Sequence, residues 1–198
     1  MQNELLFRIL FGILLGVVLG ISGTFRHRAD KAGGKVSLRE DGPAISIFII
    51  VARILMLAVI LSQLFRPQWI QWATLALPTS LRWLGAGIGA AAIPLSYWVM
   101  SSLGKNVTPT SATRKDASLV TSGPYRWVRH PLYSVGILFL MGMSLLTANW
   151  LFAVFFVLAF LVMRARMPME ERRLIEKFGD EYRSYMGRTG RFFPRLLA

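Results

Sequence analysis

Five long apolar runs, separated by short segments that carry most of the charge, constrain the fold of this chain more than any other feature. They cover residues 5–21, 44–65, 81–100, 133–146 and 150–163. At about 1.5 Å per helical residue, each of the first three can cross most of a hydrocarbon layer about 30 Å thick. Only three residues separate the last two, which predicts a tight helical hairpin that crosses twice when it borrows flanking residues. We therefore predict an all-α integral membrane protein with five transmembrane helices.

The distribution of charge supports this interpretation. The formal net charge is +13, yet charged residues make up only 17% of the 198 residues and hydrophobic residues 54%. A nucleic-acid-binding surface would gather its basic residues on one face, whereas here they lie between apolar runs. Most of them follow the first, third and fifth runs, so the positive-inside rule predicts an N-terminus outside and a C-terminus in the cytoplasm. We expect membrane lipids as partners and no nucleic acid.

Residue types that are rare or missing narrow the function further. The chain has no Cys and only two His, His27 and His130, so disulfides and thiolate metal sites are excluded and we expect no metal centre. A cleavable signal peptide is a second interpretation of the first run, but Glu4 precedes that run and the basic cluster follows it. A dinucleotide-binding GxGxxA string begins at Gly85. Because it lies inside an apolar run with no strand before it, we expect Gly85 and Gly89 to form a helix-packing face.

Two polar segments flank the predicted hairpin and carry the groups that chemistry needs. In the first, residues 103–133, the Gly-Pro pair at 123–124 predicts a turn. Pro131 is typical of the first position of a helix, which leaves His130 at the N-cap. A helix N-terminus offers unpaired N–H donors that suit a carboxylate. The alternative is that His130 caps the helix in water, with the nearby aromatic residues at the level of the lipid headgroups.

The second polar segment follows the hairpin. A proline and a glycine bound a predicted helix at residues 168–179. At 100° per residue, Glu171 falls in the middle of an apolar stripe and Glu170 at its edge. A carboxylate on a buried stripe is costly unless a cation or a hydrogen bond meets it. Glu171 is therefore either a functional carboxylate or the acid of a structural ion pair with Arg166 or Arg129.

Arg53 is the one charged residue near the middle of the second apolar run. An ionisable residue at such a depth is a functional hypothesis because of its cost there. Helix carbonyls or a carboxylate from the polar segments are equally good structural partners. We therefore assign Arg53 to no site.

An ordered set of short motifs runs through the second half of the chain. It comprises Leu119-Val120, Gly123-Pro124-Tyr125, Arg129-His130-Pro131-Leu132-Tyr133, the short apolar hairpin, Arg166, Glu170-Glu171 and Phe178-Gly179-Asp180-Glu181-Tyr182. In this combination the chain, from about residue 103 to 194, resembles the isoprenylcysteine carboxyl methyltransferase family, part of a wider group that includes phospholipid N-methyltransferases. It departs from the family at Ala117, where several members carry His, and at Val107, where an aromatic residue is common.

The resemblance implies a membrane enzyme that transfers a methyl group from S-adenosyl-L-methionine to the carboxylate of a lipophilic, isoprenylcysteine-like substrate entering from the bilayer. Arg166 would face the substrate carboxylate and act with Glu171 as the catalytic residues. The cofactor-binding residues would be Ala117, Ser118, Leu119, Val120, Tyr125, His130, Pro131, Leu132, Tyr133 and Glu170. A methyltransferase-like region at 103–198, with a cytoplasmic C-terminal helical cap, would form one integrated domain with an N-terminal three-helix region at 1–102.

Three other functions are open at this point. A phospholipid or other amine N-methyltransferase on the same scaffold would meet its amine with a carboxylate or aromatic faces and not with Arg166. A non-catalytic membrane protein would use its basic surface to bind anionic lipid or a partner, which explains the charge but leaves Glu170 and Glu171 without a task. A pyridine-nucleotide reductase of the sterol-reductase type is disfavoured by the short chain and by the Arg166 and Glu170 arrangement.

Overall fold

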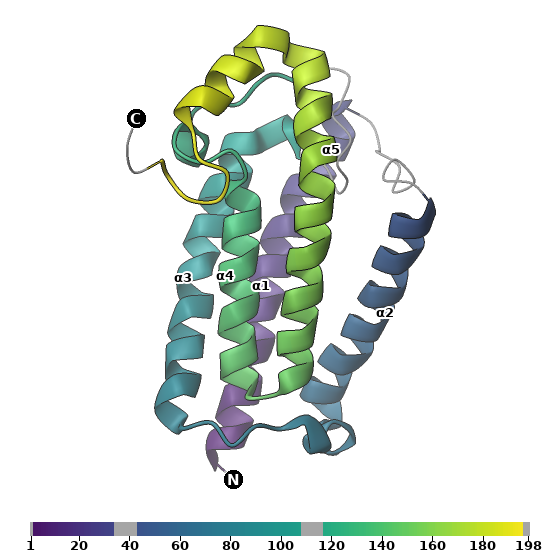
Figure 1. Ribbon diagram of the computed structural model, residues 1–198. Coiled ribbons are helices and arrows are strands. Elements are labelled where there is room, and N and C mark those ends of the chain that lie inside the picture. The colour runs from purple at the N-terminus through teal and green to yellow at the C-terminus, as the bar shows by residue number, and fades with distance from the viewer. Residues whose placement is uncertain (1, 34–42, 108–116, 196–198) are drawn as a thin grey trace.

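In the part of the chain that the structure describes, five α-helices make up most of the protein (Figure 1). They are α1 (Gln2–Gly33), α2 (Pro43–Phe65), α3 (Thr79–Leu103), α4 (Pro131–Thr147) and α5 (Trp150–Arg188). The computed structural model describes residues 2–33, 43–107 and 117–195, and these residues form no β-strand. Four basic residues of the charge argument, Lys35, Arg39, Arg114 and Lys115, lie outside the described residues.

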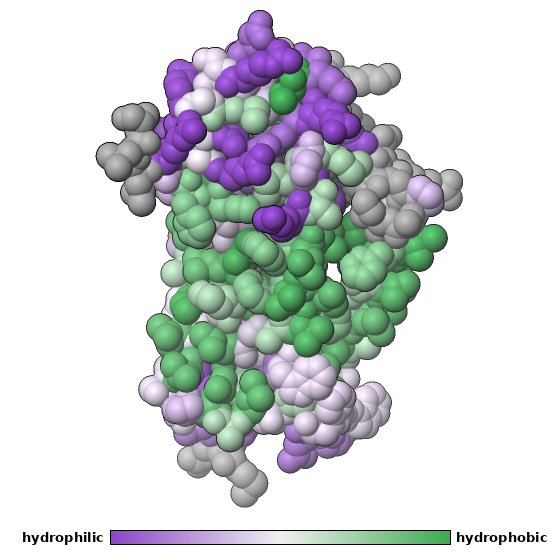
Figure 2. Space-filling view, viewed as in Figure 1, coloured by the Kyte–Doolittle hydropathy of each residue, from purple (hydrophilic) through white to green (hydrophobic). Residues whose placement is uncertain are grey.

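The helices form a multi-pass membrane protein. By length and composition, α1, α2, α3 and α5 can each cross a membrane, whereas α4 is a shorter apolar helix of 17 residues. Figure 2 shows an apolar band around the middle of the molecule, between more polar surfaces at its two ends. The all-α fold is thus confirmed, while the count of five spans and the sidedness of the termini stay predictions. We call the end with the turn at residues 147–149 the hairpin end, and the opposite end the polar end.

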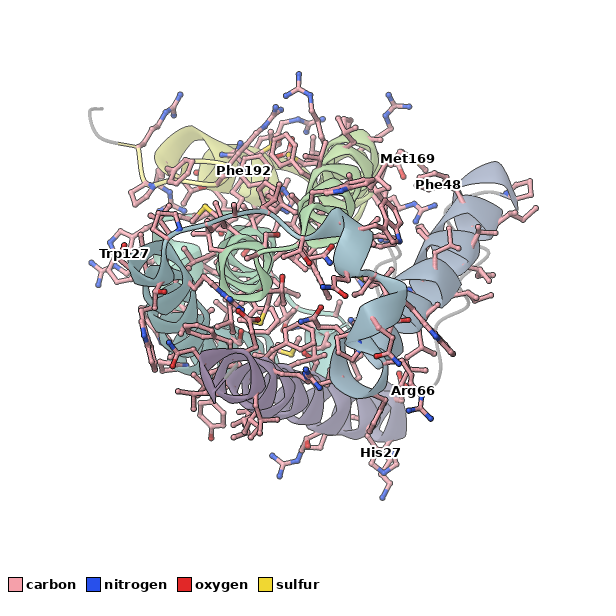
Figure 3. The ribbon with its side chains drawn as sticks, turned by 90° about the horizontal axis from the view of Figure 1, so that it is seen from below. His27, Phe48, Arg66, Trp127, Met169 and Phe192 are labelled. Carbon is pink, nitrogen blue, oxygen red and sulfur yellow. The ribbon has the colours of Figure 1, made fainter. Side chains whose placement is uncertain are left out.

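Close approach of backbones holds the centre of the bundle together. Viewed along the bundle, α4 lies in the middle with α1, α3 and α5 around it, and α2 lies outside this cluster (Figure 3). A Cβ on Gly85 of α3 would lie 2.6 Å from the backbone nitrogen of Leu146, and one on Gly142 of α4 would lie 2.7 Å from that of Gly89. The predicted packing face of Gly85 and Gly89 is therefore confirmed. The buried core of these four helices includes Phe7, Phe11, Val99, Phe139, Met143, Leu146 and Phe152.

The hairpin end is fixed by one buried arginine and one cap. Arg82 pairs with Glu4 through its two terminal guanidinium nitrogens and donates from Nε to the carbonyl of Leu146 at 3.1 Å, which ties α1 and α3 to the end of α4. The turn itself uses Ala148 in the left-handed region, with φ of 48°. The side chain of Asn149 then accepts a hydrogen bond from the amide of Leu151 and so caps α5. The predicted tight hairpin of α4 and α5 is confirmed.

The last helix differs from the prediction. A helix beginning at Pro168 was expected, but α5 runs from Trp150 through Pro168 without a break. Proline removes the hydrogen bond to the carbonyl four residues earlier. Pro168 and Arg164 are both exposed, so water can satisfy the freed carbonyl and the helix continues. The predicted end at Gly179 corresponds to a kink, where φ of 56° and ψ of −128° turn the remaining helix back over the polar end (Figure 1).

Candidate functional site at the polar end

The chain after α5 returns to the start of α4 and pairs with it backbone to backbone. The amide of Arg129 donates to the carbonyl of Gly190 at 2.8 Å, and that of His130 donates to the carbonyl of Arg191 at 3.0 Å. The amide of Gly190 donates in turn to the carbonyl of Trp127 at 3.1 Å. Ser134 adds a side-chain bond to the carbonyl of Phe192. These bonds hold residues 189–195, which we call the tail, against the residues that precede α4. They also occupy the backbone amide of His130, which is therefore not available to bind a carboxylate.

Glu171 lies at the centre of a buried ion-pair cluster. Its Oε1 accepts from Arg129 Nε at 3.1 Å and lies 3.4 Å from His130 Nε2, and its Oε2 accepts from Arg191 at 3.1 Å. The residue is only 4% exposed. Arg129 also donates to the carbonyls of Met186 and Thr189 near the end of α5. The ion pair with Arg129 is therefore present, and both oxygens of Glu171 are engaged by the protein.

The charges around Glu171 decide its protonation state. It lies well beyond the apolar half of α5, which ends near residue 163. Burial of the carboxyl favours its neutral form, but hydrogen bonds from His130 and Arg129, with the positive charges of Arg129 and Arg191, outweigh that effect and lower its pKa to about 2. Glu171 is an anion at every physiological pH.

Glu170 faces a different environment, although it is the next residue. Its Oε2 accepts a hydrogen bond from the Tyr133 hydroxyl at 2.7 Å and lies 4.0 Å from His130 Nδ1. Its side chain is 27% exposed, whereas that of Glu171 is 6% exposed. The rings of His130 and Tyr133 stack at 5.4 Å with an angle of 10° between their planes. The N-terminus of α4 and the second half of α5 thus meet around a carboxylate that solvent can reach.

Buried tyrosines line the inner side of this meeting point. Tyr125 is 7% exposed, and its carbonyl accepts a hydrogen bond from the Tyr185 hydroxyl at 2.6 Å. Burial and, second, the negative charge of Glu170 raise the pKa of Tyr125 above its usual value of 10, so its hydroxyl stays protonated. Tyr182 is buried as well, and within the described residues its hydroxyl has no hydrogen-bond partner. An unpartnered buried hydroxyl is a group that a polar ligand can satisfy.

The remaining predicted residues also lie at the polar end, and they differ in how far they are buried. His130 is at the N-cap of α4 and Pro131 at its first position, as predicted, but the His130 side chain makes no capping bond. Arg166 lies one turn before Glu170 on α5 and is half-buried. Pro131 is buried, Ser118 is exposed, and the others are half-buried: Ala117, Leu119, Val120 and Leu132.

Sequence reasoning missed three residues of this site, among them Tyr182, which stands in the family motif but was not predicted as a site residue. Arg191 follows the last helix, and no periodic pattern marks it as a partner of Glu171. The Tyr185 contact is also unmarked, because its hydroxyl bonds a backbone carbonyl and any residue at position 125 would supply one. Among the described residues, no group of three or more potential metal ligands occurs.

The fold and site together define a class: a multi-pass helical membrane protein that holds a carboxylate, an imidazole and several phenols together at one end. The model of the isoprenylcysteine carboxyl methyltransferase family matches residues 86–176, so the family resemblance is confirmed. A solved structure of the eukaryotic intramembrane Ras methyltransferase of that name shares the fold, with a TM-score of 0.55 and 22% identity, over 75% of this chain and 53% of that one.

Curated relatives match part of the chain. A cobalt-zinc-cadmium resistance protein of Cupriavidus metallidurans is 39% identical over 83 residues, which are 42% of this chain and 38% of that protein. The protein-S-isoprenylcysteine O-methyltransferase of Schizosaccharomyces pombe is 36% identical over 87 residues, which are 43% of this chain and 37% of that protein. The matches therefore span less than half the length of these relatives.

Proposed function

We propose that the protein is a membrane methyltransferase that uses S-adenosyl-L-methionine and methylates the carboxylate of a lipophilic substrate. The observation that carries this proposal is the meeting of Glu170 with Tyr133 and His130, two segments about forty residues apart in the chain, beside an unpartnered buried hydroxyl. The family resemblance supplies the reaction class. The relatives match this chain over less than half of their own length, so their names do not establish its activity, and the methyl transfer is our proposal.

The residues at the polar end suit this cofactor. Glu170 is a partly exposed acceptor that can bind an ammonium group. The Tyr133 and Tyr182 hydroxyls and the His130 ring add polar partners, while Leu119, Val120 and Leu132 offer apolar surface. Ala117, Ser118, Tyr125 and Pro131 complete the proposed cofactor-binding set. S-adenosyl-L-methionine, when bound, supplies an electrophilic methyl group on a sulfonium.

The chain then has to align an acceptor and exclude water, and it needs no covalent nucleophile. We assign the acceptor to Arg166, because a guanidinium orients a carboxylate through two parallel hydrogen bonds. Too strong an ion pair would lower the nucleophilicity of that carboxylate, so Arg166 orients the carboxylate without fully neutralising its charge. An amine acceptor fits this site less well, because a guanidinium repels an ammonium group, whereas a carboxylate or an aromatic face attracts it.

The sequence predicts that Glu171 is catalytic alongside Arg166. We propose a different role for Glu171. Both of its oxygens are engaged by Arg129, His130 and Arg191, and the residue is only 4% exposed, so a substrate has little access to it. We propose that Glu171 is a positioning residue that holds the His130 ring and the tail in place. Its replacement is then expected to weaken cofactor binding through His130 and to leave the chemistry of a bound acceptor unchanged.

A methyl-transfer assay tests this function. Purified protein in lipid nanodiscs is offered S-adenosyl-L-methionine labelled in its methyl group, with a prenylated cysteine analogue or phosphatidylethanolamine as acceptor. We expect label in the prenylated analogue, and Arg166→Ala should abolish it while S-adenosylhomocysteine still binds. The matched control is Arg172→Ala, an exposed arginine on the same helix. Label in phosphatidylethanolamine alone would replace the acceptor with an amine, and label in neither would favour a non-catalytic lipid- or partner-binding protein.

A further inference from the structure

The uncharged part of α5 is short for a membrane span. It begins at Trp150, the first residue of the helix, and ends at Arg164, whose side chain is exposed. Arg164 comes fourteen positions after Trp150, so at about 1.5 Å per residue this part of α5 is about 21 Å long. A typical hydrocarbon layer is about 30 Å thick. With Trp150 at one boundary of such a layer, Arg164 would lie about 9 Å inside the other.

Two other helices have the same short height. α4, which forms the hairpin with α5, has 17 residues and is therefore about 25 Å long. On α3, Trp83 and Trp98 are fifteen positions apart, or about 22 Å, and both are exposed. Tryptophan is enriched at the level of the lipid headgroups, so two exposed tryptophans on one helix indicate its two interfaces. Tilt only shortens the height of a helix along the membrane normal.

The tryptophans gather at the two ends of the bundle. At the hairpin end, the ring centroids of Trp72 and Trp150 lie 5.4 Å apart. At the polar end, those of Trp98 and Trp127 lie 6.1 Å apart, and the guanidinium of Arg126 lies 5.0 Å from the Trp127 centroid. Amphipathic rings beside cations are typical of the membrane–water interface. All six tryptophans of the chain are exposed, four at the hairpin end and two at the polar end: Trp69, Trp72, Trp83 and Trp150, then Trp98 and Trp127.

Arg53 provides a measure of this height on α2. The segment after α2 is held at the hairpin end, since the Asn149 side chain donates to the carbonyl of Ile70 at 3.1 Å. Arg53 precedes Arg66 by thirteen positions, or about 20 Å. A layer of about 30 Å that begins at Arg66 would leave the exposed Arg53 about 10 Å inside hydrocarbon, where a charge is costly. A layer of about 22 Å leaves Arg53 a short distance from water, which its long side chain covers even with the inclination of α2 seen in Figure 1.

We propose that the surface of the protein that faces hydrocarbon is only about 21–25 Å tall, so that α4 spans the membrane and the surrounding bilayer is thinned by roughly 5–9 Å. Figure 2 shows this surface as the apolar band between the two polar ends. The bilayer has to thin because tilt cannot accommodate a span that is too short. α1 has about 27 Å between Arg8 and Arg26 and is long enough to tilt in the same layer.

The partner that fits this surface is a bilayer whose lipids have short acyl chains. In such a bilayer Glu170, six positions beyond Arg164 on α5, lies about 9 Å outside the hydrocarbon, near the outer edge of the headgroups. The inference concerns the lipid-facing surface alone and does not rest on the proposed methyl transfer.

The response to acyl-chain length tests the proposal on the wild-type protein. Full-length protein is reconstituted in nanodiscs of phosphatidylcholines whose monounsaturated chains have 14, 16, 18, 20 or 22 carbons, and its unfolding temperature is measured in each. We expect the maximum at 14 or 16 carbons and a steady fall toward 22, because each added carbon increases the mismatch. A maximum at 18 carbons or more, or an unfolding temperature independent of chain length, would overturn the proposal.

Thiol accessibility tests where the boundary lies on α2. The chain has no Cys, so Ile47→Cys and its matched control Leu57→Cys each carry a single thiol, and both positions are exposed. Ile47 lies about 28 Å before Arg66 and Leu57 about 14 Å before it, so only Ile47 lies outside a layer of about 22 Å, whereas both lie inside one of about 30 Å.

In nanodiscs of the 18-carbon lipid, a membrane-impermeant maleimide should therefore modify Ile47→Cys at least about tenfold faster than Leu57→Cys, because the reactive thiolate forms in water. Circular dichroism establishes that both variants are folded. Equal rates for the two thiols would overturn the proposal.

Discussion

Replacing Glu171 by Gln removes the anion that joins the tail, the start of α4 and α5. Holding a carboxyl pKa near 2, in place of 4.5, corresponds to about 3 kcal/mol at about 1.4 kcal/mol per pH unit. Arg191 contributes little to that figure, because its side chain is 57% exposed and water compensates its loss. The hydrogen bonds from His130 and Arg129 are the larger causes of the lowered pKa, and Arg129, whose side chain is only 8% exposed, would lose its counter-charge in the variant.

We therefore expect Glu171→Gln to lower the unfolding temperature in detergent by roughly 6–12 °C, from about 2–4 °C per kcal/mol for a chain of this size. Limited proteolysis should then cleave the tail after residue 188 sooner than in wild type. Glu176→Gln is the matched control, because Glu176 is exposed on the same helix, and its effect should stay within about 0.5 kcal/mol. An unfolding temperature for Glu171→Gln equal to that of the control would refute the ion-pair argument.

Three further outcomes follow from the structure. Because the folded-state pKa of Glu171 is depressed, its contribution is complete above pH 4.5 and is lost as pH falls toward 2, so acid titration should destabilise wild type in this window and spare Glu171→Gln. Gly85→Val should destabilise the bundle by a few kcal/mol in thermal unfolding, since its side chain would overlap the backbone of α4, whereas Gly87→Val has open space and should be tolerated. Gly179→Ala should cost about 1 kcal/mol because φ is positive there, and Gly187→Ala should not; equal losses would remove the kink argument.

Much of this architecture is predictable from local pattern. The hairpin follows from two apolar runs with three residues between them, and the glycine face from a four-residue spacing inside a span. The meeting of His130 with Glu170 follows once both ends of that hairpin are taken to open on one side. Each of these rests on spacing along a helix, which the chain carries in its sequence.

Other parts depend on tertiary contacts that spacing does not encode. α5 continues through Pro168 because that residue lies on an exposed face, and exposure is known only once the neighbours are placed. The tail joins Arg129 and His130 through backbone bonds, which are independent of side-chain type. The engagement of Glu171 by Arg191 depends on that return, so the sequence alone could not separate a catalytic from a positioning carboxylate.

Binding of S-adenosylhomocysteine tests most directly whether the start of α4 and the second half of α5 jointly hold a charged ligand. Isothermal titration calorimetry on nanodisc-embedded protein should detect binding to wild type, and Glu170→Gln should weaken it about 10- to 100-fold, the loss of one charge-assisted hydrogen bond worth about 1.5–3 kcal/mol. Tyr133→Phe should weaken it less, and Glu176→Gln not at all. Absence of binding to folded wild type, or equal affinities for wild type and Glu170→Gln, would contradict the account.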